Sequence, residues 1–229
     1  MGLKENFKKV RREGRKVLTL QESAEVLKKY KIPFVKAKLV KNAGEAVDFS
    51  EKAGYPVVMK VVSKDVIHKT DVGGIILNIK NRQEVERAFR EIVNSVKRHV
   101  PRARIDGMFI YKMVEEGAEA IIGGKKDAQF DQVIMFGLGG IFTEVLKDVS
   151  FRVVPINRKD AEEMVKETKG YEILKGYRGK KYNVESLVDI LQKASKLLDE
   201  NREIEELDIN PIIVSPKNAI AVDARIVID

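Results

Sequence analysis

The sequence contains no cysteine among its 229 residues. Disulfide bonds, thiolate metal sites and cysteine nucleophiles are therefore excluded, and a cytoplasmic location is expected. No apolar run approaches the roughly 18 residues that a membrane-spanning helix requires, and we expect no signal peptide at the N-terminus. Two motifs are also missing, the P-loop pattern G-x-x-x-x-G-K-[ST] and the dinucleotide fingerprint G-x-G-x-x-G, so an anion site of either kind is excluded.

Positive charge is concentrated at one end of the chain. The net charge is +8, yet residues 1–17 alone hold seven bases and two acids, against 36 bases and 33 acids in the remainder. We expect a basic N-terminal extension over residues 1–18 that is solvated or packs on a partner. No aromatic-rich strand accompanies it, so no nucleic-acid partner is expected. Abundant Lys, Glu and Arg without Cys is typical of thermophilic proteins.

Apolar periodicity and capping residues predict a chain of the α+β class in two lobes. Because αβ units alternate with runs of strands, this class is favoured over a regular parallel sheet. A break near residues 103–115 separates lobes at 19–108 and 109–229. Helices are predicted at residues 19–31, 42–52, 82–100, 158–168, 171–176 and 184–200. Strands are predicted at residues 34–40, 55–62, 75–79, 105–114, 118–125, 132–136, 143–146, 151–155, 204–214 and 220–228, the last two as a hairpin.

Two basic side chains stand out in the first lobe. Lys60 interrupts an apolar strand, which is costly unless its ammonium reaches a charged partner. It either contacts a phosphate or extends from an edge strand to water. His68 lies in a polar loop, residues 63–74, that ends in two glycines. Because such loops commonly cover phosphates, His68 is either a nucleophile that accepts a phosphoryl group or a surface residue. His99 is interpreted as structural.

The second lobe carries oxygen ligands and a glycine-rich run. Strand alternation puts Glu206, Asp208 and Asn210 on one face, and Asp223 on the partner strand can come alongside them. Oxygen ligands without His or Cys suit Mg²⁺ that bridges nucleotide phosphates, and the alternative is a polar face turned to solvent. The glycines of residues 137–144 either bring backbone amides close to an anion or make a turn.

Four segments in this order resemble the ATP-grasp domain of the NDP-forming acyl-CoA synthetases, in particular the beta subunits of the ADP-forming acetate–CoA ligases. They are residues 53–60, 68–74, 137–148 and 208–211, within a similarity that extends over residues 19–229. The resemblance implies an ATP-grasp fold with the nucleotide site in the cleft between two α+β lobes. It also implies the reaction acyl-CoA + ADP + phosphate ⇌ carboxylate + CoA + ATP.

The resemblance assigns ATP or ADP to residues of both lobes. A lysine contacts the phosphates and assists catalysis, backbone groups of the hinge bind adenine, and an acidic side chain takes the ribose hydroxyls. In the order of the chain, the implied nucleotide-binding residues are Val58, the phosphate ligand Lys60, the hinge residues Met113, Val114 and Glu115, the ribose ligand Glu119, and Gly139 and Gly140.

The resemblance also assigns the groups that transfer phosphate. Asn210 and Asp223 are implied to bind Mg²⁺, with Asp208 as a third ligand. Arg152 steadies the transferring charge. His68 corresponds to a histidine that relays phosphate between a distant site and the nucleotide. Related succinyl-CoA synthetase beta chains lack a histidine in this loop, so its presence favours the acetate-type group.

A second subunit follows from the same resemblance. The alpha subunit binds CoA, forms an acyl phosphate and carries its own phosphohistidine, commonly in an alpha-two beta-two heterotetramer. We expect the 229 residues to be too few for the whole reaction. Two alternatives remain open. Another ATP-dependent ligase that forms an acyl phosphate leaves His68 without a role, and a silent nucleotide-binding regulatory module leaves both Lys60 and His68 without one.

Overall fold

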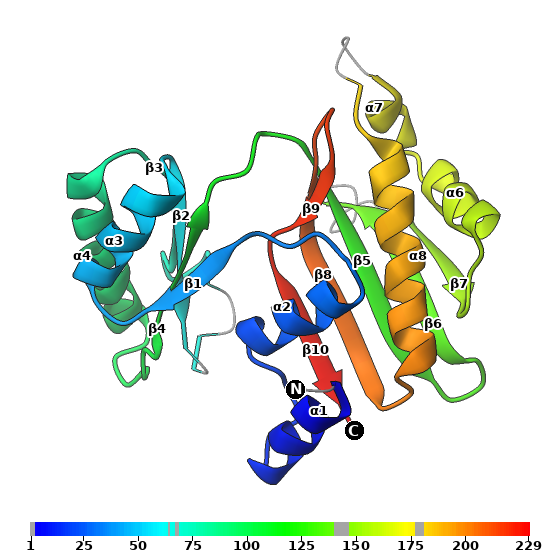
Figure 1. Cartoon of the computed structure of the whole chain (residues 1–229), viewed down its shortest axis with the longest axis horizontal. Coiled ribbons are helices and arrows are strands. Elements are labelled where there is room, and N and C mark those ends of the chain that lie inside the picture. Colours follow the sequence, from blue (N-terminus) through cyan, green and yellow to red (C-terminus); the bar gives the residue numbers. More distant parts are fainter. Residues whose placement is uncertain (1–2, 64, 67–68, 140–146, 177–180) are drawn as a thin grey trace. The chain divides into compact units, whose positions relative to one another are not determined.

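The computed structural model describes the whole chain except residues 1–2, 64, 67–68, 140–146 and 177–180 (Figure 1). Two antiparallel sheets with helices packed on them confirm the predicted α+β class. None of the helices in this described part is both long and apolar enough to span a bilayer. The elements are, in order, α1 (Leu3–Arg12), α2 (Leu20–Lys29), β1 (Ala37–Val40), α3 (Ala43–Ala53), β2 (Val57–Val62), β3 (Ile75–Ile79), α4 (Arg82–His99), β4 (Gly107–Lys112), β5 (Ala118–Asp127), β6 (Asp131–Leu138), β7 (Val149–Val153), α6 (Arg158–Glu167), α7 (Tyr171–Gly176), α8 (Val184–Glu200), β8 (Ile204–Val214), β9 (Ala219–Ala221) and β10 (Ala224–Ile228).

The chain forms two compact units. The smaller unit is the continuous segment Val35–Val114, and the larger unit combines Met1–Phe34 with Glu115–Asp229. These bounds differ from the predicted lobes, because α1 and α2 pack into the same apolar core as the C-terminal strands and helices. Amphipathic patterning locates each helix, but it does not tell which sheet the helix covers.

The smaller unit is a four-stranded antiparallel sheet in the order β1-β4-β2-β3. Asn42 and Asn81 directly precede helices α3 and α4 and cap them, because their side chains accept hydrogen bonds from backbone N–H groups three residues later. Buried residues of both helices join those of β2 and β4 in one core. Within β2 this core takes Val57, Met59 and Val61. Strand alternation therefore turns Lys60 to the face opposite α3 and α4.

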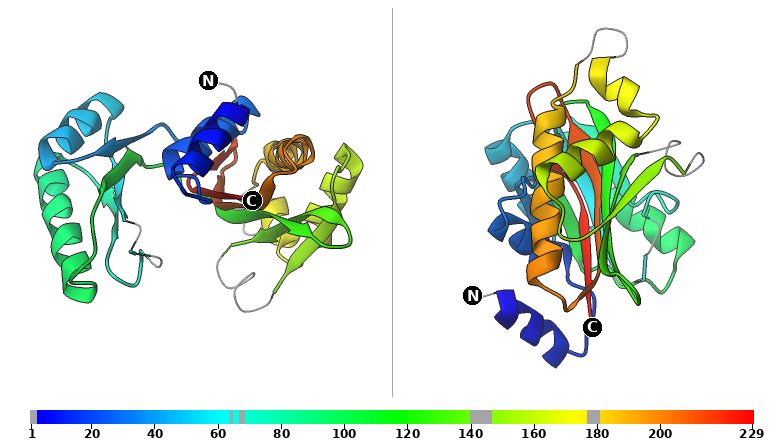
Figure 2. Two further views of the ribbon diagram at one scale, coloured as in Figure 1. Left: turned by 90° about the horizontal axis from the view of Figure 1, so that it is seen from below. Right: turned by 90° about the vertical axis from the view of Figure 1, so that its right-hand side faces the viewer.

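The larger unit is an antiparallel sheet in the order β10-β8-β5-β6-β7, with β9 paired to the far end of β8. Its helices contribute to a single core with the buried side chains of the sheet, so they cover one face (Figures 1 and 2). We call the opposite face the second face. The register places Asp208, Gly123, Met135 and Phe151 side by side across it, one each from β8, β5, β6 and β7.

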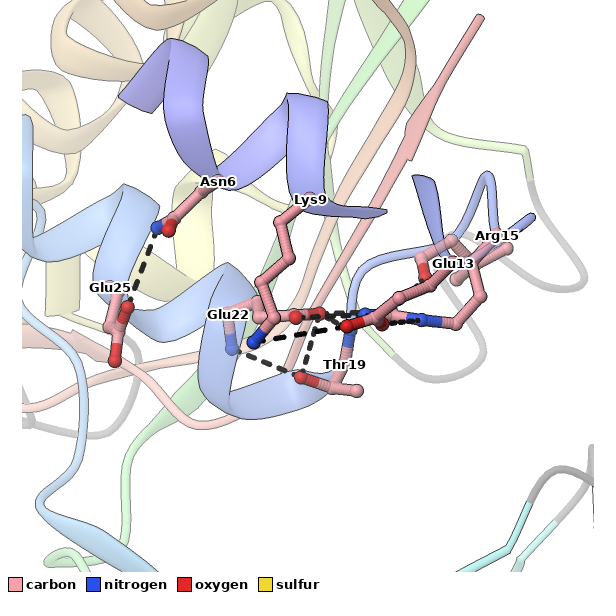
Figure 3. A network of polar contacts seen from close by, with 8 residues as sticks. Asn6, Lys9, Glu13, Arg15, Thr19, Glu22 and Glu25 are labelled. Atoms are coloured by element: carbon pink, nitrogen blue, oxygen red, sulfur yellow. Dashed lines mark hydrogen bonds and ion pairs between the residues drawn. The ribbon is translucent and has the colours of Figure 1, made fainter. Parts of the chain in front are cut away.

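The basic N-terminal segment is part of the larger unit rather than a solvated tail. Helix α1 buries Leu3, Phe7 and Val10 in the core of this unit. Arg15 forms ion pairs with Glu13 at 2.6 Å and Glu22 at 2.9 Å. Glu22 in turn completes the capping box of α2 with Thr19 (Figure 3). Apolar residues at spacings of four and three are the signal for a helix that the run of positive charge obscured.

Most predicted elements are confirmed, with two differences near the termini. Helix α1 was not predicted. The predicted strand 220–228 divides into β9 and β10, which leaves Val222 and Asp223 between them. The predicted strand 143–146 lies outside the described residues.

Candidate functional site

Lys60 lies in the middle of β2, between β3 and β4. Its side chain is 7% exposed, and its Nζ lies 5.5 Å from the centre of the Tyr111 ring. An ammonium in this position is attracted by the face of the ring. Because β2 is an internal strand, the interpretation of Lys60 as an edge-strand residue that reaches water is wrong. Val58 lies two residues earlier on the same face and is buried.

The loop that contains His68 is anchored on its N-terminal side. His68 itself lies outside the described residues. Asp65 accepts a hydrogen bond from the backbone N–H of Arg104 at 2.8 Å. The side chain of Val66 is buried in the core of the smaller unit. The backbone is therefore fixed two residues before His68.

The C-terminal side of the same loop is also fixed. The N–H of Gly74 donates to the carbonyl of Lys69 at 2.7 Å, and the carbonyl of Gly74 accepts from Val61 in β2 at 2.7 Å. Gly73 has a φ of 62°, and a Cβ there would lie 2.6 Å from the Oγ of Ser95 in α4. Only glycine fits this turn without a shift. The paired glycines thus hold the segment that follows His68 against the sheet.

Met113, Val114 and Glu115 follow β4, and the boundary between the two compact units falls between Val114 and Glu115. The N–H of Met113 donates to the carbonyl of Pro56 at 2.9 Å, which extends the pairing of β4 with β2. The carboxylate of Glu115 accepts from Lys217 at 2.8 Å. The N–H of Met113 is therefore engaged within the smaller unit.

Asp208 and Asn210 lie on the second face of the larger sheet, where alternation predicted them. Both side chains are exposed. The register of β8 with β5 shifts between Ile209 and Ile212, so Asn210 sits in a bulge of the strand. The N–H of Asn210 donates to the carbonyl of Asp223 at 3.2 Å, which holds the turn between β9 and β10 beside β8. These three oxygen-bearing residues are thus brought together.

The charges of Asp208 and Asp223 act on each other. The pKa of Asp208 is raised by the loss of surrounding water and by the negative charge of Asp223, while Arg225 opposes the shift. A cation bound between the two carboxylates would relieve this repulsion.

The donor set fits Mg²⁺ together with a nucleotide, rather than a metal bound by protein alone. Within the described ranges, no group of three or more His, Cys, Asp or Glu side chains lies close enough to hold a metal ion. Mg²⁺ usually takes one or two carboxylates, water and the oxygens of substrate phosphates. Asp208, Asp223 and the amide oxygen of Asn210 meet this requirement.

Glu119 and Gly139 lie side by side on β5 and at the end of β6. The N–H of Gly139 donates to the carbonyl of Glu119 at 2.7 Å. A Cβ at Gly139 would lie 2.8 Å from the Cβ of Glu119, so the close approach requires glycine. The Glu119 side chain is exposed. Gly140 lies outside the described residues.

The structure separates Arg152 from the acidic residues of the site. Arg152 pairs with Ile134, a buried core residue, so its side chain lies on the face that the helices cover. Both terminal nitrogens of its guanidinium bond to Glu167 of α6. The pKa of Glu167 is lowered by this bond. The role of Arg152 visible here is to tie α6 to β7.

The sequence alone indicated no role for Tyr111 or for Asp148. Tyr111 lies under the ammonium of Lys60. This contact depends on the register of β2 with β4, in which Val58 pairs with Tyr111. Asp148 is 9% exposed and accepts hydrogen bonds from the backbone N–H groups of Lys169 and Gly170, at 2.9 and 2.8 Å. It therefore fixes the chain directly before β7.

The sequence matches known proteins over almost its whole length. A family profile described as an ATP-grasp domain matches residues 9–228. The beta subunit of ADP-forming acetate–CoA ligase I from Pyrococcus furiosus is 49% identical over 226 residues, which are 98% of this chain and 97% of that subunit. ADP-forming acetate–CoA ligase I from Archaeoglobus fulgidus is 47% identical over 90% of this chain, and the match spans 30% of that longer protein.

Solved structures give the same relationship. A chain of acetyl-coenzyme A synthetase 1 from Ca. Korarchaeum cryptofilum, in complex with coenzyme A and Ca-AMPCP, has a TM-score of 0.95, 44% identity and full coverage of both chains. A second structure of that enzyme contains coenzyme A and Mg-AMPPCP, and its phosphohistidine segment points towards the nucleotide-binding site. It matches with a TM-score of 0.87 and 40% identity, again over both whole chains.

Proposed function

We propose that this chain, which belongs to the ATP-grasp domains of the ADP-forming acetate–CoA ligases, binds the nucleotide and exchanges phosphate with it. The reaction is acyl-CoA + ADP + phosphate ⇌ carboxylate + CoA + ATP. The observation that carries the proposal is the 49% identity to a separate beta subunit of almost equal length. A beta subunit implies an alpha subunit, to which we assign CoA binding and the formation of the acyl phosphate.

We assign the transfer step to His68. In the direction of ATP formation, the bond between phosphorus and an imidazole nitrogen of phosphorylated His68 breaks. A terminal oxygen of the β-phosphate of ADP forms the new bond to phosphorus, and the ring nitrogen recovers its electron pair. The loop is anchored at Val66 before His68 and at Lys69–Gly74 after it, which supports a defined place for this loop beside β2.

Lys60 and the acidic residues have complementary tasks in this proposal. The buried ammonium of Lys60, oriented by Tyr111, binds the phosphate oxygens and offsets their charge during transfer. Asp208, Asp223 and Asn210 would hold Mg²⁺, which when bound neutralises charge on the phosphates. Phosphoryl transfer depends mainly on such positioning and charge compensation, so these side chains need no covalent role.

The nucleoside is assigned to the segment after β4 and to Glu119. Because the N–H of Met113 is engaged by Pro56, adenine would use the other backbone groups of residues 113–115. Exposed Glu119 would accept hydrogen bonds from the ribose hydroxyls, with Gly139 allowing close approach beside it. Arg152 is left out of this proposed site because its guanidinium is bound to Glu167 on the opposite face.

Reconstitution of ATP synthesis tests the proposal. This protein is mixed with a separately purified alpha subunit, acetyl-CoA, ADP, phosphate and Mg²⁺, and ATP is measured by luminescence. We expect ATP from the mixture and none from either subunit alone, because the acyl phosphate and the nucleotide are handled by different chains. The alpha subunit is first shown to be active with its own beta subunit. ATP formation by this chain alone, or none in the mixture, would contradict the proposal.

The raised pKa of Asp208 predicts how Mg²⁺-dependent nucleotide binding varies with pH. Only the ionised carboxylate binds the cation, so affinity should fall as pH drops through a pKa above the ordinary aspartate value of about 3.9. The dissociation constant of Mg-ATP is measured by calorimetry across pH. Asp208→Asn should bind Mg-ATP more weakly and remove this step from the pH profile. A profile that is the same in wild type and Asp208→Asn would remove Asp208 from the metal site.

A further inference from the structure

Unpaired backbone groups at the edge of a sheet can pair with another chain. Both edges of the smaller sheet have features that disfavour such pairing. At β1, the side chains of Lys36 and Lys38 are charged and exposed. At β3, Asn78 has a φ of 57° and the register with β2 shifts. A strand that carries charge or is distorted in this way is a poor template for a further strand.

One edge of the larger sheet is covered by the chain itself. Leu18 donates its N–H to the carbonyl of Ile226 at 3.0 Å, and the carbonyl of Lys16 accepts from Ile228 at 2.9 Å. Farther along, Ala221 of β9 donates to the carbonyl of Pro33 at 2.9 Å. The N-terminal segment thus occupies the backbone groups at the outer side of β9 and β10.

The remaining edge, at β7, differs from these. The N–H of Val154 donates to the carbonyl of Gln132 at 2.9 Å. In the register of β7 with β6, this bond identifies which residues of β7 exchange hydrogen bonds with β6 and which do not. By alternation, the backbone groups of Arg152 face β6 and those of Phe151 and Val153 face away from the sheet. Two outward groups of β7 are engaged within the chain, because the carbonyl of Phe151 accepts from the guanidinium of Arg152 at 2.9 Å and the N–H of Val149 donates to the carbonyl of Lys147 at 3.0 Å. Within the described part of the chain, no backbone hydrogen bond occupies the outward N–H groups of Phe151 and Val153.

The side chains of the same two residues are apolar and exposed. Phe151 is 56% exposed and Val153 is 49% exposed, both on the second face. The charge of Arg152 is paired with Glu167 of α6 on the opposite face, and the same guanidinium also donates to the carbonyl of Phe151. An edge strand with exposed apolar side chains is a site where another chain can add a strand.

We propose that the outer edge of β7 is the surface on which an extended segment of the alpha subunit docks by adding a strand to this sheet. Phe151 and Val153 would supply the apolar contacts and their outward N–H groups the hydrogen bonds. The proposal rests on the proposed function, which requires an alpha subunit. In the longer relative from Archaeoglobus fulgidus, the region that matches this chain is only 30% of the protein, so the remaining domains are joined to it covalently. A separate beta subunit instead needs a surface that binds its partner.

The position of β7 relative to the acidic residues favours the alpha subunit as occupant. Phe151, Met135, Gly123 and Asp208 form one row across four adjacent strands. Three interstrand spacings amount to about 14 Å. A partner bound at β7 would therefore lie close to the proposed Mg²⁺ residues, as an exchange of phosphate between the subunits requires.

Two substitutions separate the side-chain and backbone contributions. Phe151→Lys places a charge among the apolar contacts. Val153→Pro removes only an N–H that faces away from β6, so the existing sheet should tolerate it. Leu77→Lys is the matched control, because Leu77 is a 58% exposed apolar residue in the edge strand β3. Thermal unfolding and Mg-ATP binding by the isolated chain report whether the variants fold normally.

Affinity for the alpha subunit is measured by calorimetry, and the mass of the isolated chain by light scattering. We expect Phe151→Lys and Val153→Pro to weaken binding by roughly 10–100-fold, and Leu77→Lys to leave it unchanged. Unaltered affinity in both β7 variants would overturn the docking surface and leave the proposed function intact. The docking surface would also be overturned if the wild type is a dimer that Phe151→Lys dissociates while the affinity for the alpha subunit stays unchanged. In that case β7 would bind a second copy of this chain. Failure of the wild type to bind alpha would instead contradict the proposed function.

Discussion

Replacing Lys60 with methionine is expected to lower kcat for ATP formation by about 10²–10³-fold, the usual effect of losing one preorganised electrostatic contact to the reacting group. The side chain is 7% exposed and held over the Tyr111 ring, so water cannot easily take the place of its charge. Methionine preserves much of the length and apolar volume, which separates loss of charge from loss of packing. The measurement is steady-state ATP formation with the alpha subunit present.

Two controls make this result interpretable. Lys112→Met removes an exposed lysine from β4 of the same sheet and should leave kcat unchanged. Tyr111→Phe keeps the aromatic face under the ammonium and should retain most of the activity, whereas Tyr111→Leu should not. A Lys60→Met protein that folds and retains wild-type kcat would show that Lys60 has a purely structural role.

Local pattern was sufficient for most of the fold. Asn42 and Asn81 mark helix starts because an N-cap depends on residues only three positions apart. Helix α1 was not predicted, because seven bases in the first 17 residues suggested a solvated extension. Its three buried residues nonetheless follow helical spacing. The membership of α1 and α2 in the larger unit depends on tertiary packing, which no local pattern encodes.

The candidate site shows the same limit. Asp208 and Asn210 share a face because they are two residues apart in one strand, so alternation was enough to group them. Arg152 could not be assigned in this way, because its face depends on the register of β7 with β6. A shift of one residue in that register would exchange the positions of Arg152 and Phe151. The contact of Lys60 with Tyr111 likewise depends on pairing between strands distant in sequence.

Replacing His68 with asparagine is expected to abolish phosphate transfer between ATP and this chain. Asparagine retains polarity and some hydrogen-bonding capacity, but its amide nitrogen has no electron pair free to attack phosphorus. The effect should therefore be complete rather than partial, in contrast to the loss of Lys60. His99→Asn is the matched control, because the ring of His99 is exposed and its Nδ1 lies 2.9 Å from the carbonyl of Ser95 within α4.

The most direct measurement is covalent labelling of the purified chain with ATP labelled in its γ-phosphate, in the presence of Mg²⁺. The wild type and His99→Asn should acquire label that is labile in acid and stable in base, as expected for phosphohistidine. His68→Asn should acquire none while still binding Mg-ATP. Label of the same stability on the His68→Asn protein would contradict the assignment of the phosphate relay to His68.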